Sequence, residues 1–148
     1  MVFAGNRYAY GYCTYYAFNK RAAAGRPVGS NWGNATTWAA LARASGFAVD
    51  KNPQAGDVFQ TSGGWGGYGH VGYVERVNED GSVLVSEMNY AGWNRVSSRT
   101  ISPDQVGPVN RDVLFEFRQL SQVVLLAQPE FWRYLQRPHL RGCRTLPS

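Results

Sequence analysis

Apolar positions in the first third of the chain recur with a helical period. Residues 14–24 contain no proline, become alanine-rich and stop at Gly25, which predicts a helix that begins next to Cys13. Asn34 is expected to be the N-cap of a second helix that runs through Ser45. One face of that helix would carry Trp38, Leu41, Ala42 and Ser45, and we expect Trp38 to belong to the core.

After Gly46 the apolar positions alternate, as in strands that bury one face. Strands are therefore expected at residues 47–49, 58–61, 70–77, 83–89, 96–101 and 113–117. The segment between the third and the fourth of these, residues 78–82, is typical of a hairpin turn. Two helices followed by an antiparallel sheet predict the α+β fold class.

After about Gln119 the apolar positions no longer follow a helical or an alternating pattern. An apolar patch at residues 123–127 is followed by aromatic residues interleaved with arginines. Pro129 and Pro138 would interrupt an amphipathic membrane helix in this region. We therefore expect one folded domain over residues 1–117 and a basic, aromatic, loosely ordered tail over residues 118–148.

Composition and charge narrow the class of protein. The 148 residues, 44% apolar and 17% charged, are typical of one globular domain. The net charge of +5 is unevenly distributed: residues 1–117 carry 10 Lys and Arg against 9 Asp and Glu, whereas residues 118–148 carry 5 Arg against Glu130 alone. Because the basic excess lies in the tail and no recognition motif accompanies it, we expect no nucleic-acid partner. We also expect the protein to be a monomer.

The sequence lacks the motifs of a metal site, a membrane-spanning segment, a signal peptide and a phosphate-binding loop. No cluster of Cys and His has metal-site spacing, so no metal or other cofactor is expected. No run of about 20 apolar residues could span a bilayer, and the first residues lack the apolar region of a signal peptide. The glycine-rich segment 62–69 lacks the Gly-Lys-Ser/Thr of a phosphate loop, which favours a rim loop presenting Trp65 and Tyr68.

Cys13 is the first candidate for a catalytic residue. A cysteine in the first turn of a helix feels the partial positive charge of unpaired backbone N–H groups, which favours the nucleophilic thiolate. The ordinary role of a lone cysteine, a small buried apolar residue, is the alternative. The other cysteine, Cys143, lies among arginines without a base at a matching spacing, and we interpret it as incidental.

The hairpin supplies candidate partners for this thiol. If its turn is centred between Glu79 and Asp80, His70 lies opposite Asn89, and alternation places Glu87 on the same face of the sheet. One imidazole nitrogen can then share the thiol proton while the other is oriented by a carboxylate or amide. A register slip of one residue would turn Glu87 and Asn89 to the opposite face.

Gly72 lies opposite Glu87 in the same register and would leave room for the imidazole ring. Taken singly, a histidine at the start of a strand and a glutamate within one are usually surface residues. Their combination with a cysteine at a helix start favours a cysteine-dependent active site.

These segments resemble the CHAP domain (cysteine, histidine-dependent amidohydrolase/peptidase), found in secreted bacterial wall hydrolases and phage endolysins. The resemblance covers residues 6–107, and the secretory-antigen type is most similar. Its motifs are Gly-Tyr-Cys-Thr-Tyr-Tyr-Ala-Phe at 11–18, Asn-Trp-Gly-Asn at 31–34, Pro-x-x-Gly-Asp at 53–57, Gly-His-Val-x-Tyr-Val-Glu at 69–75, Val-Ser-Glu-Met-Asn-Tyr at 85–90 and Ser-Ser-Arg-Thr-Ile at 97–101.

The resemblance implies a papain-like fold and hydrolysis of an amide bond in peptidoglycan. It implies that Cys13 is the nucleophile, His70 the general base, and Glu87 and Asn89 the residues that orient the imidazole. Tyr12 stands where many relatives carry Gln, and Tyr15 where many carry Trp. These departures concern the second oxyanion-hole donor and leave the backbone N–H of Cys13 as a donor. Some relatives bind calcium through acidic residues before the cysteine, and this chain has none there, so no calcium site is expected. The family implies a secreted or cell-wall location, or release by a phage.

The aromatic residues expected to line a substrate groove lie in loops near these positions: Trp32, Trp65, Tyr68, Tyr90 and Trp93. Within the hydrolase interpretation, an N-acetylmuramoyl-L-alanine amidase and an endopeptidase both remain open. Two other functions are also open: a non-catalytic wall-binding module on the same fold, and a basic protein of nucleic acid or membrane surfaces that relies on the arginines of the tail.

Overall fold

The sheet consists of six strands in the order β1-β6-β2-β3-β4-β5, and every neighbouring pair is antiparallel. The computed structural model describes residues 5–62, 65–106 and 115–118. Its strands are β1 (Ala48–Asp50), β2 (Val58–Thr61), β3 (His70–Val77), β4 (Val83–Met88), β5 (Val96–Ile101) and β6 (Phe115–Arg118).

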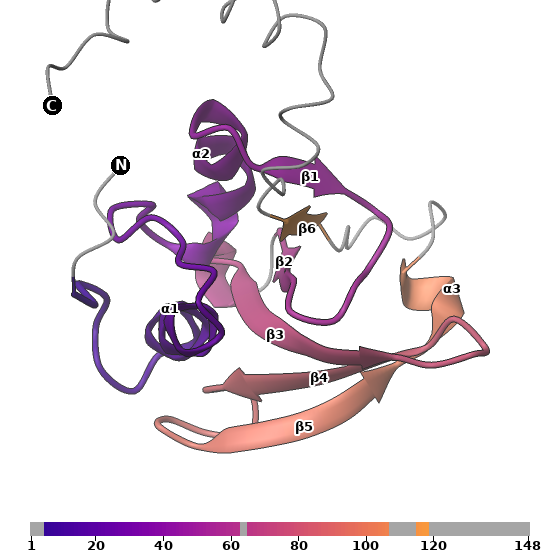
Figure 1. Ribbon diagram of the computed structural model, residues 1–148. Coiled ribbons are helices and arrows are strands. Elements are labelled where there is room, and N and C mark those ends of the chain that lie inside the picture. The colour runs from indigo at the N-terminus through magenta and orange to yellow at the C-terminus, as the bar shows by residue number, and fades with distance from the viewer. Residues whose placement is uncertain (1–4, 63–64, 107–114, 119–148) are drawn as a thin grey trace, which may run out of the picture.

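Three helices of the described residues precede or connect these strands along the chain, and the first two pack against the sheet. They are α1 (Cys13–Ala23), α2 (Trp38–Ala44) and α3 (Pro103–Val106), with short 3₁₀ turns η1 (Ala35–Thr37) and η2 (Trp65–Gly67). Figure 1 shows α1 beside the face of β3 and β4, while α2 lies near β1. The α+β, papain-like arrangement of N-terminal helices on an antiparallel sheet is confirmed.

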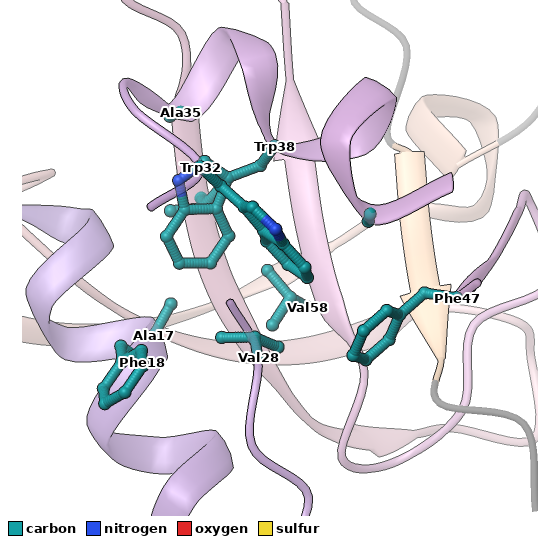
Figure 2. Packing of buried hydrophobic residues seen from close by; sticks show 10 residues of the cluster. Ala17, Phe18, Val28, Trp32, Ala35, Trp38, Phe47 and Val58 are labelled. Atoms are coloured by element: carbon teal, nitrogen blue, oxygen red, sulfur yellow. The ribbon is translucent and has the colours of Figure 1, made fainter. Parts of the chain in front are cut away.

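The main core lies between the helices and the sheet. Figure 2 shows Trp32 and Trp38 at its centre, with Phe47 beside them. The Trp32 ring centroid lies 5.6 Å from that of Trp38 and 5.2 Å from that of Phe47, both in edge-to-face geometry. Trp38 has no exposed surface, as expected for a core residue. A second cluster, centred on Phe59, lies on the other face of the sheet.

The second helix differs from the expected one at both its start and its buried face. Residues 35–37 form the 3₁₀ turn η1, and the side chain of Asn34 makes no capping hydrogen bond. Instead the Asn34 carbonyl accepts hydrogen bonds from the backbone N–H and the hydroxyl of Thr37. α2 starts at Trp38 and buries Trp38, Ala39 and Ala42, so Leu41 is not part of the buried face and is 38% exposed.

The β3–β4 hairpin reaches the expected register by an unexpected route. Next to the turn, Val77 pairs with Val83, one position away from the register expected from the sequence. A bulge at Glu75 then inserts one extra residue into β3, and beyond it Tyr73 pairs with Ser86 as expected. The two deviations cancel, so the end of the hairpin near His70 keeps the expected alternation.

The C-terminal strand lies inside the sheet. β6 pairs with β1 on one side and with β2 on the other. It extends through Arg118, so the expected division between residues 117 and 118 falls within this strand. The expectation of a loosely ordered tail concerns residues 119–148, which, like Cys143, lie outside the described residues.

Candidate active site

Cys13 is the first residue of α1 and is partly buried. The chain turns into the helix at Gly11, whose φ of +87° favours glycine. A Cβ at this position would also lie 2.7 Å from the indole of Trp93. Tyr12 is the N-cap, in an extended conformation, and its carbonyl accepts a hydrogen bond from Tyr16 N–H. This local geometry presents the Cys13 thiol at the positive end of the helix.

His70 is the first residue of β3 and is buried, with 4% of its surface exposed. Gly69 before it has a φ of +70°, and a Cβ there would lie 2.6 Å from the backbone oxygen of Thr61. The imidazole lies near two aromatic rings, with centroid distances of 5.8 Å to Phe59 and 5.9 Å to Tyr90. Only glycine fits before the histidine, and aromatic packing fixes its ring.

Hydrogen bonds join three side chains from three strands, His70, Glu87 and Arg99. Cys13 lines the same pocket as His70, and interaction with its thiol is one cause of the raised pKa of His70. Nε2 of His70 lies 2.8 Å from Oε2 of Glu87, which is fully buried on β4. Arg99 on β5 donates from Nε to Oε1 of Glu87 at 2.6 Å and from Nη2 to Oε2 at 3.4 Å.

These contacts determine the charges of the buried groups. Burial alone would lower the pKa of His70, but the hydrogen bonds with Cys13 and Glu87 outweigh it and raise that pKa to about 9. Burial likewise would raise the pKa of Glu87, but His70 and Arg99 outweigh it and hold that pKa below its usual range. These contacts therefore favour the imidazolium form of His70 and the carboxylate form of Glu87.

Sequence reasoning did not assign a role to Arg99, although it lies in the last of the quoted motifs. Arg99 pairs with Val85 across β4 and β5, and Glu87 pairs with Ser97. Residues two positions apart on a strand share a face, so Arg99 is a diagonal neighbour of Glu87. Alternation along these two strands was the signal that could have identified it.

The thiol and the imidazole open into one pocket of about 970 Å³. Asn89 lines the same pocket directly after β4, where a φ of +68° ends the strand one residue earlier than expected. The pocket therefore collects Cys13, His70 and Asn89, while Glu87 lies behind the imidazole. Its size suits a small ligand or a short peptide.

The five aromatic residues expected to line the groove do not all lie at the pocket. Tyr68 is exposed and lines the pocket. Tyr90, 45% exposed, lies beside the His70 ring, and Trp93, 61% exposed, packs near Gly11. Trp32 is a correction: it is 2% exposed within the core, because its ring packs against those of Trp38 and Phe47, so it cannot line a groove. The side chain of Trp65 lies outside the described part.

Gly72 is also placed differently from the sequence interpretation. The space that a Cβ would need there is taken by the ring of Phe59, not by the imidazole. Phe59 pairs with Gly72 across β2 and β3 and in turn contacts His70. The glycine therefore supports the histidine through an intervening aromatic ring.

Residues 5–62, 65–106 and 115–118 contain neither a metal-binding cluster nor a membrane-spanning helix. No group of three or more His, Cys, Asp or Glu side chains in these ranges is arranged to hold a metal ion. None of the helices in the same ranges combines the length and the apolar content that crossing a bilayer requires.

Comparisons with known proteins point to one family. Residues 3–89 match the family model described as the CHAP domain. Over 97 residues the chain is 61% identical to a Staphylococcus aureus protein named "Probable autolysin LDP", covering 66% of this chain and 34% of that protein. Over 106 residues it is 51% identical to the staphylococcal secretory antigen SsaA of the same species, covering 71% of this chain and 40% of the antigen.

A solved structure gives the same result. A crystal structure of an N-acetylmuramoyl-L-alanine amidase from Staphylococcus aureus matches 79% of this chain and 33% of its own, with a TM-score of 0.70 and 29% identity. The chain thus spans about a third to two fifths of the length of these relatives. Since the family model covers more than half of the 148 residues, the chain belongs to the CHAP domain family.

Proposed function

We propose that this protein hydrolyses an amide bond of bacterial peptidoglycan, with Cys13 as nucleophile and His70 as general acid and base. The observation that carries the proposal is one pocket lined by both Cys13 and His70, with the imidazole held by the buried carboxylate of Glu87 at 2.8 Å. Membership of the CHAP family supports it, as do relatives named an autolysin and an amidase. The relatives' names also support action outside the cell, on the wall.

In the first half of the proposed reaction, the Cys13 thiolate attacks the carbonyl carbon of the scissile amide. The carbonyl electron pair moves to oxygen, and backbone N–H groups at the start of α1 stabilise the resulting oxyanion. Such a donor contributes about 3 kcal/mol in comparable sites. The His70 imidazolium then gives its proton to the leaving nitrogen, the C–N bond breaks, and a thioester remains on Cys13.

In the second half, a water molecule attacks the thioester while His70 accepts one of its protons. The C–S bond breaks, the carboxylic acid product leaves, and the thiolate–imidazolium pair is restored. Nε2 of His70 is bound to Glu87, so Nδ1 is the nitrogen that exchanges protons with substrate and water. The imidazole of His70 can therefore keep its contact with Glu87 throughout the catalytic cycle.

The remaining residues have positioning or binding roles in this proposal. Glu87 orients the imidazole and stabilises its charge, and Arg99 fixes the carboxylate from behind. Asn89 adds a polar group to the pocket wall near the histidine. The exposed rings of Tyr68, Tyr90 and Trp93 contribute contact surface for sugar and peptide.

Release of fragments from purified cell wall tests the proposal. We expect the full chain to release them, Cys13→Ala to release none above background, and Cys143→Ala to match the unsubstituted chain. Cys143→Ala is the matched control because it makes the same substitution at the other cysteine of the chain. Equal release by Cys13→Ala would refute the proposed nucleophile. Wall binding without release by any variant would favour the non-catalytic wall-binding module.

The same released material identifies the bond. A new free amino terminus on L-alanine together with free muramic acid carboxylate indicates an amidase. A new terminus inside the stem peptide or cross-bridge indicates an endopeptidase. Mass spectrometry of the fragments distinguishes the two outcomes directly.

A further inference from the structure

The pocket lining carries more positive than negative charge. Besides Cys13, whose thiolate is the nucleophile of the proposed reaction, the charged side chains in the lining are His70 and Arg7, and Arg7 lies on the segment before α1. Arg7 is exposed, and within the described residues no hydrogen bond or ion pair engages its guanidinium. It therefore presents unused donors to whatever enters the pocket.

Carboxylates are absent from this lining. Of the acidic side chains that the structure describes, none lines the pocket; they are Asp50, Asp57, Glu75, Glu79, Asp80, Glu87 and Asp104. Glu75 is paired with Lys20 at 2.6 Å, and Glu79 and Asp80 lie in the hairpin turn at the far end of β3. Glu87 lies nearest, and its charge is already matched by His70 and Arg99.

The charges of the catalytic groups cancel in pairs. Glu87 is balanced by Arg99, and a Cys13 thiolate is balanced by the His70 imidazolium. If the thiol is protonated, the site gains a further positive charge. In both states Arg7 adds one positive charge that nothing in the described lining neutralises. The pocket thus favours an anionic ligand.

We infer that Arg7 binds a carboxylate of the substrate, so that the preferred substrate is a wall peptide with a free carboxylate close to the scissile amide. This inference rests on the proposed function. A guanidinium binds a carboxylate through two parallel hydrogen bonds, which gives orientation as well as affinity. Since Arg7 and Cys13 line one pocket of about 970 Å³, the carboxylate would lie within a short peptide of the cleaved bond.

Matched peptides test the inference. The substrates are wall-derived peptides with their carboxylates free, with the C-terminal carboxylate alone converted to a carboxamide, and with the side-chain carboxylate alone converted. The full chain is expected to prefer the peptide with the recognised carboxylate by about fivefold in kcat/KM, the upper order of one exposed charge-assisted contact. The conversion that removes the preference identifies which carboxylate is bound.

Two variants separate a local contact from overall charge. Arg7→Gln is expected to lose this preference through KM, with little change on the carboxamide peptide. Arg76→Gln makes the same charge change near the other end of β3, about 20 Å along the strand from His70, and should keep the preference. Retained preference in Arg7→Gln, or equal loss in both variants, would overturn the inference.

A binding measurement keeps this inference separate from the proposed function. In a Cys13→Ala background, calorimetry should show tighter binding of the carboxylate peptide than of its carboxamide, and the added Arg7→Gln change should remove the difference. If peptides bind with this preference but no variant cleaves them, the hydrolase proposal fails and the Arg7 inference stands. If the full chain cleaves both peptides equally and binding shows no preference, only the Arg7 inference fails.

Discussion

Arg99 and His70 share the carboxylate of Glu87: Nε of Arg99 lies 2.6 Å from Oε1, and Nε2 of His70 lies 2.8 Å from Oε2. The guanidinium also stacks over Tyr90, 4.3 Å from the ring centroid. A fully buried carboxylate is thus paired with two cations, which is how proteins retain a buried charge at low cost. The orientation of the histidine depends on a residue that does not touch the pocket.

We predict that Arg99→Gln lowers kcat/KM for wall peptides by about tenfold, the order of one charge-assisted hydrogen bond. Without the guanidinium the pKa of Glu87 rises, because burial then opposes its charge with one counterion fewer. The acid limb of the pH–rate profile should therefore move to higher pH. Arg99→Lys, which keeps the charge, should recover part of the activity. An unchanged pH profile in Arg99→Gln would contradict a positioning role.

Removing the thiol should lower the pKa of His70. Burial opposes the charge of the imidazole, and hydrogen bonding to Cys13 is the first contact that counteracts it, ahead of Glu87. In Cys13→Ala the His70 pKa is expected to fall below about 9, while Glu87 keeps it from falling as far as burial alone would take it. NMR titration of the imidazole in both proteins measures the change. Equal values would mean that Cys13 and His70 do not interact.

The raised pKa of His70 also makes stability depend on pH. Its pKa is about 9 in the folded protein and 6.5 in the unfolded chain, so the folded state binds the proton more tightly. The resulting stabilisation, about 3 kcal/mol at most, is fully present below pH 6.5 and is lost as the pH rises through about 9. Denaturant unfolding at pH 6, 7.5 and 9.5 should show this loss for the unsubstituted chain and not for His70→Gln. A parallel pH dependence in both would refute it.

The hairpin shows what the sequence could and could not predict. Alternation placed His70 and Glu87 on one face, and the structure brings them into contact. The assumed register was nevertheless wrong next to the turn and correct beyond it, because the bulge at Glu75 has no signal in the apolar pattern. Prediction worked here because burial of one face fixes the register at the far end, whatever happens near the turn.

Trp32 shows the opposite case. Its position in a loop near the site residues led to the expectation that it lines a groove, but loops that cross a core can contribute buried side chains. A Cβ at Gly29 would collide with the Trp32 indole, so the glycine admits the ring into the core. Such close packing between non-adjacent segments is set by tertiary structure and has no periodic signature. For the same reason Arg99, visible in the sequence, had no assigned partner until β4 and β5 were paired.

Trp32→Ala should therefore act on stability. The ring is 2% exposed, and removing a buried Trp side chain costs about 3–5 kcal/mol in free energy of unfolding. Trp93→Ala, which removes the same side chain from a site that is 61% exposed, should cost much less. Denaturant unfolding compares the two variants. A stable Trp32→Ala protein that has lost only wall binding would restore Trp32 to the groove.

Removal of residues 119–148 should separate the charge of the tail from the activity of the domain. The truncation begins at 119 because β6 extends through Arg118 and pairs with both β1 and β2. The removed segment holds four arginines, Arg133, Arg137, Arg141 and Arg144, against Glu130. We expect wall hydrolysis to be kept and retention on a heparin column to fall, since exposed charge governs polyanion binding. A second truncation from residue 115 also removes β6 and should lower the free energy of unfolding. If the first truncation instead abolishes hydrolysis while the protein stays folded, the tail belongs to the active domain and the division proposed from the sequence is wrong.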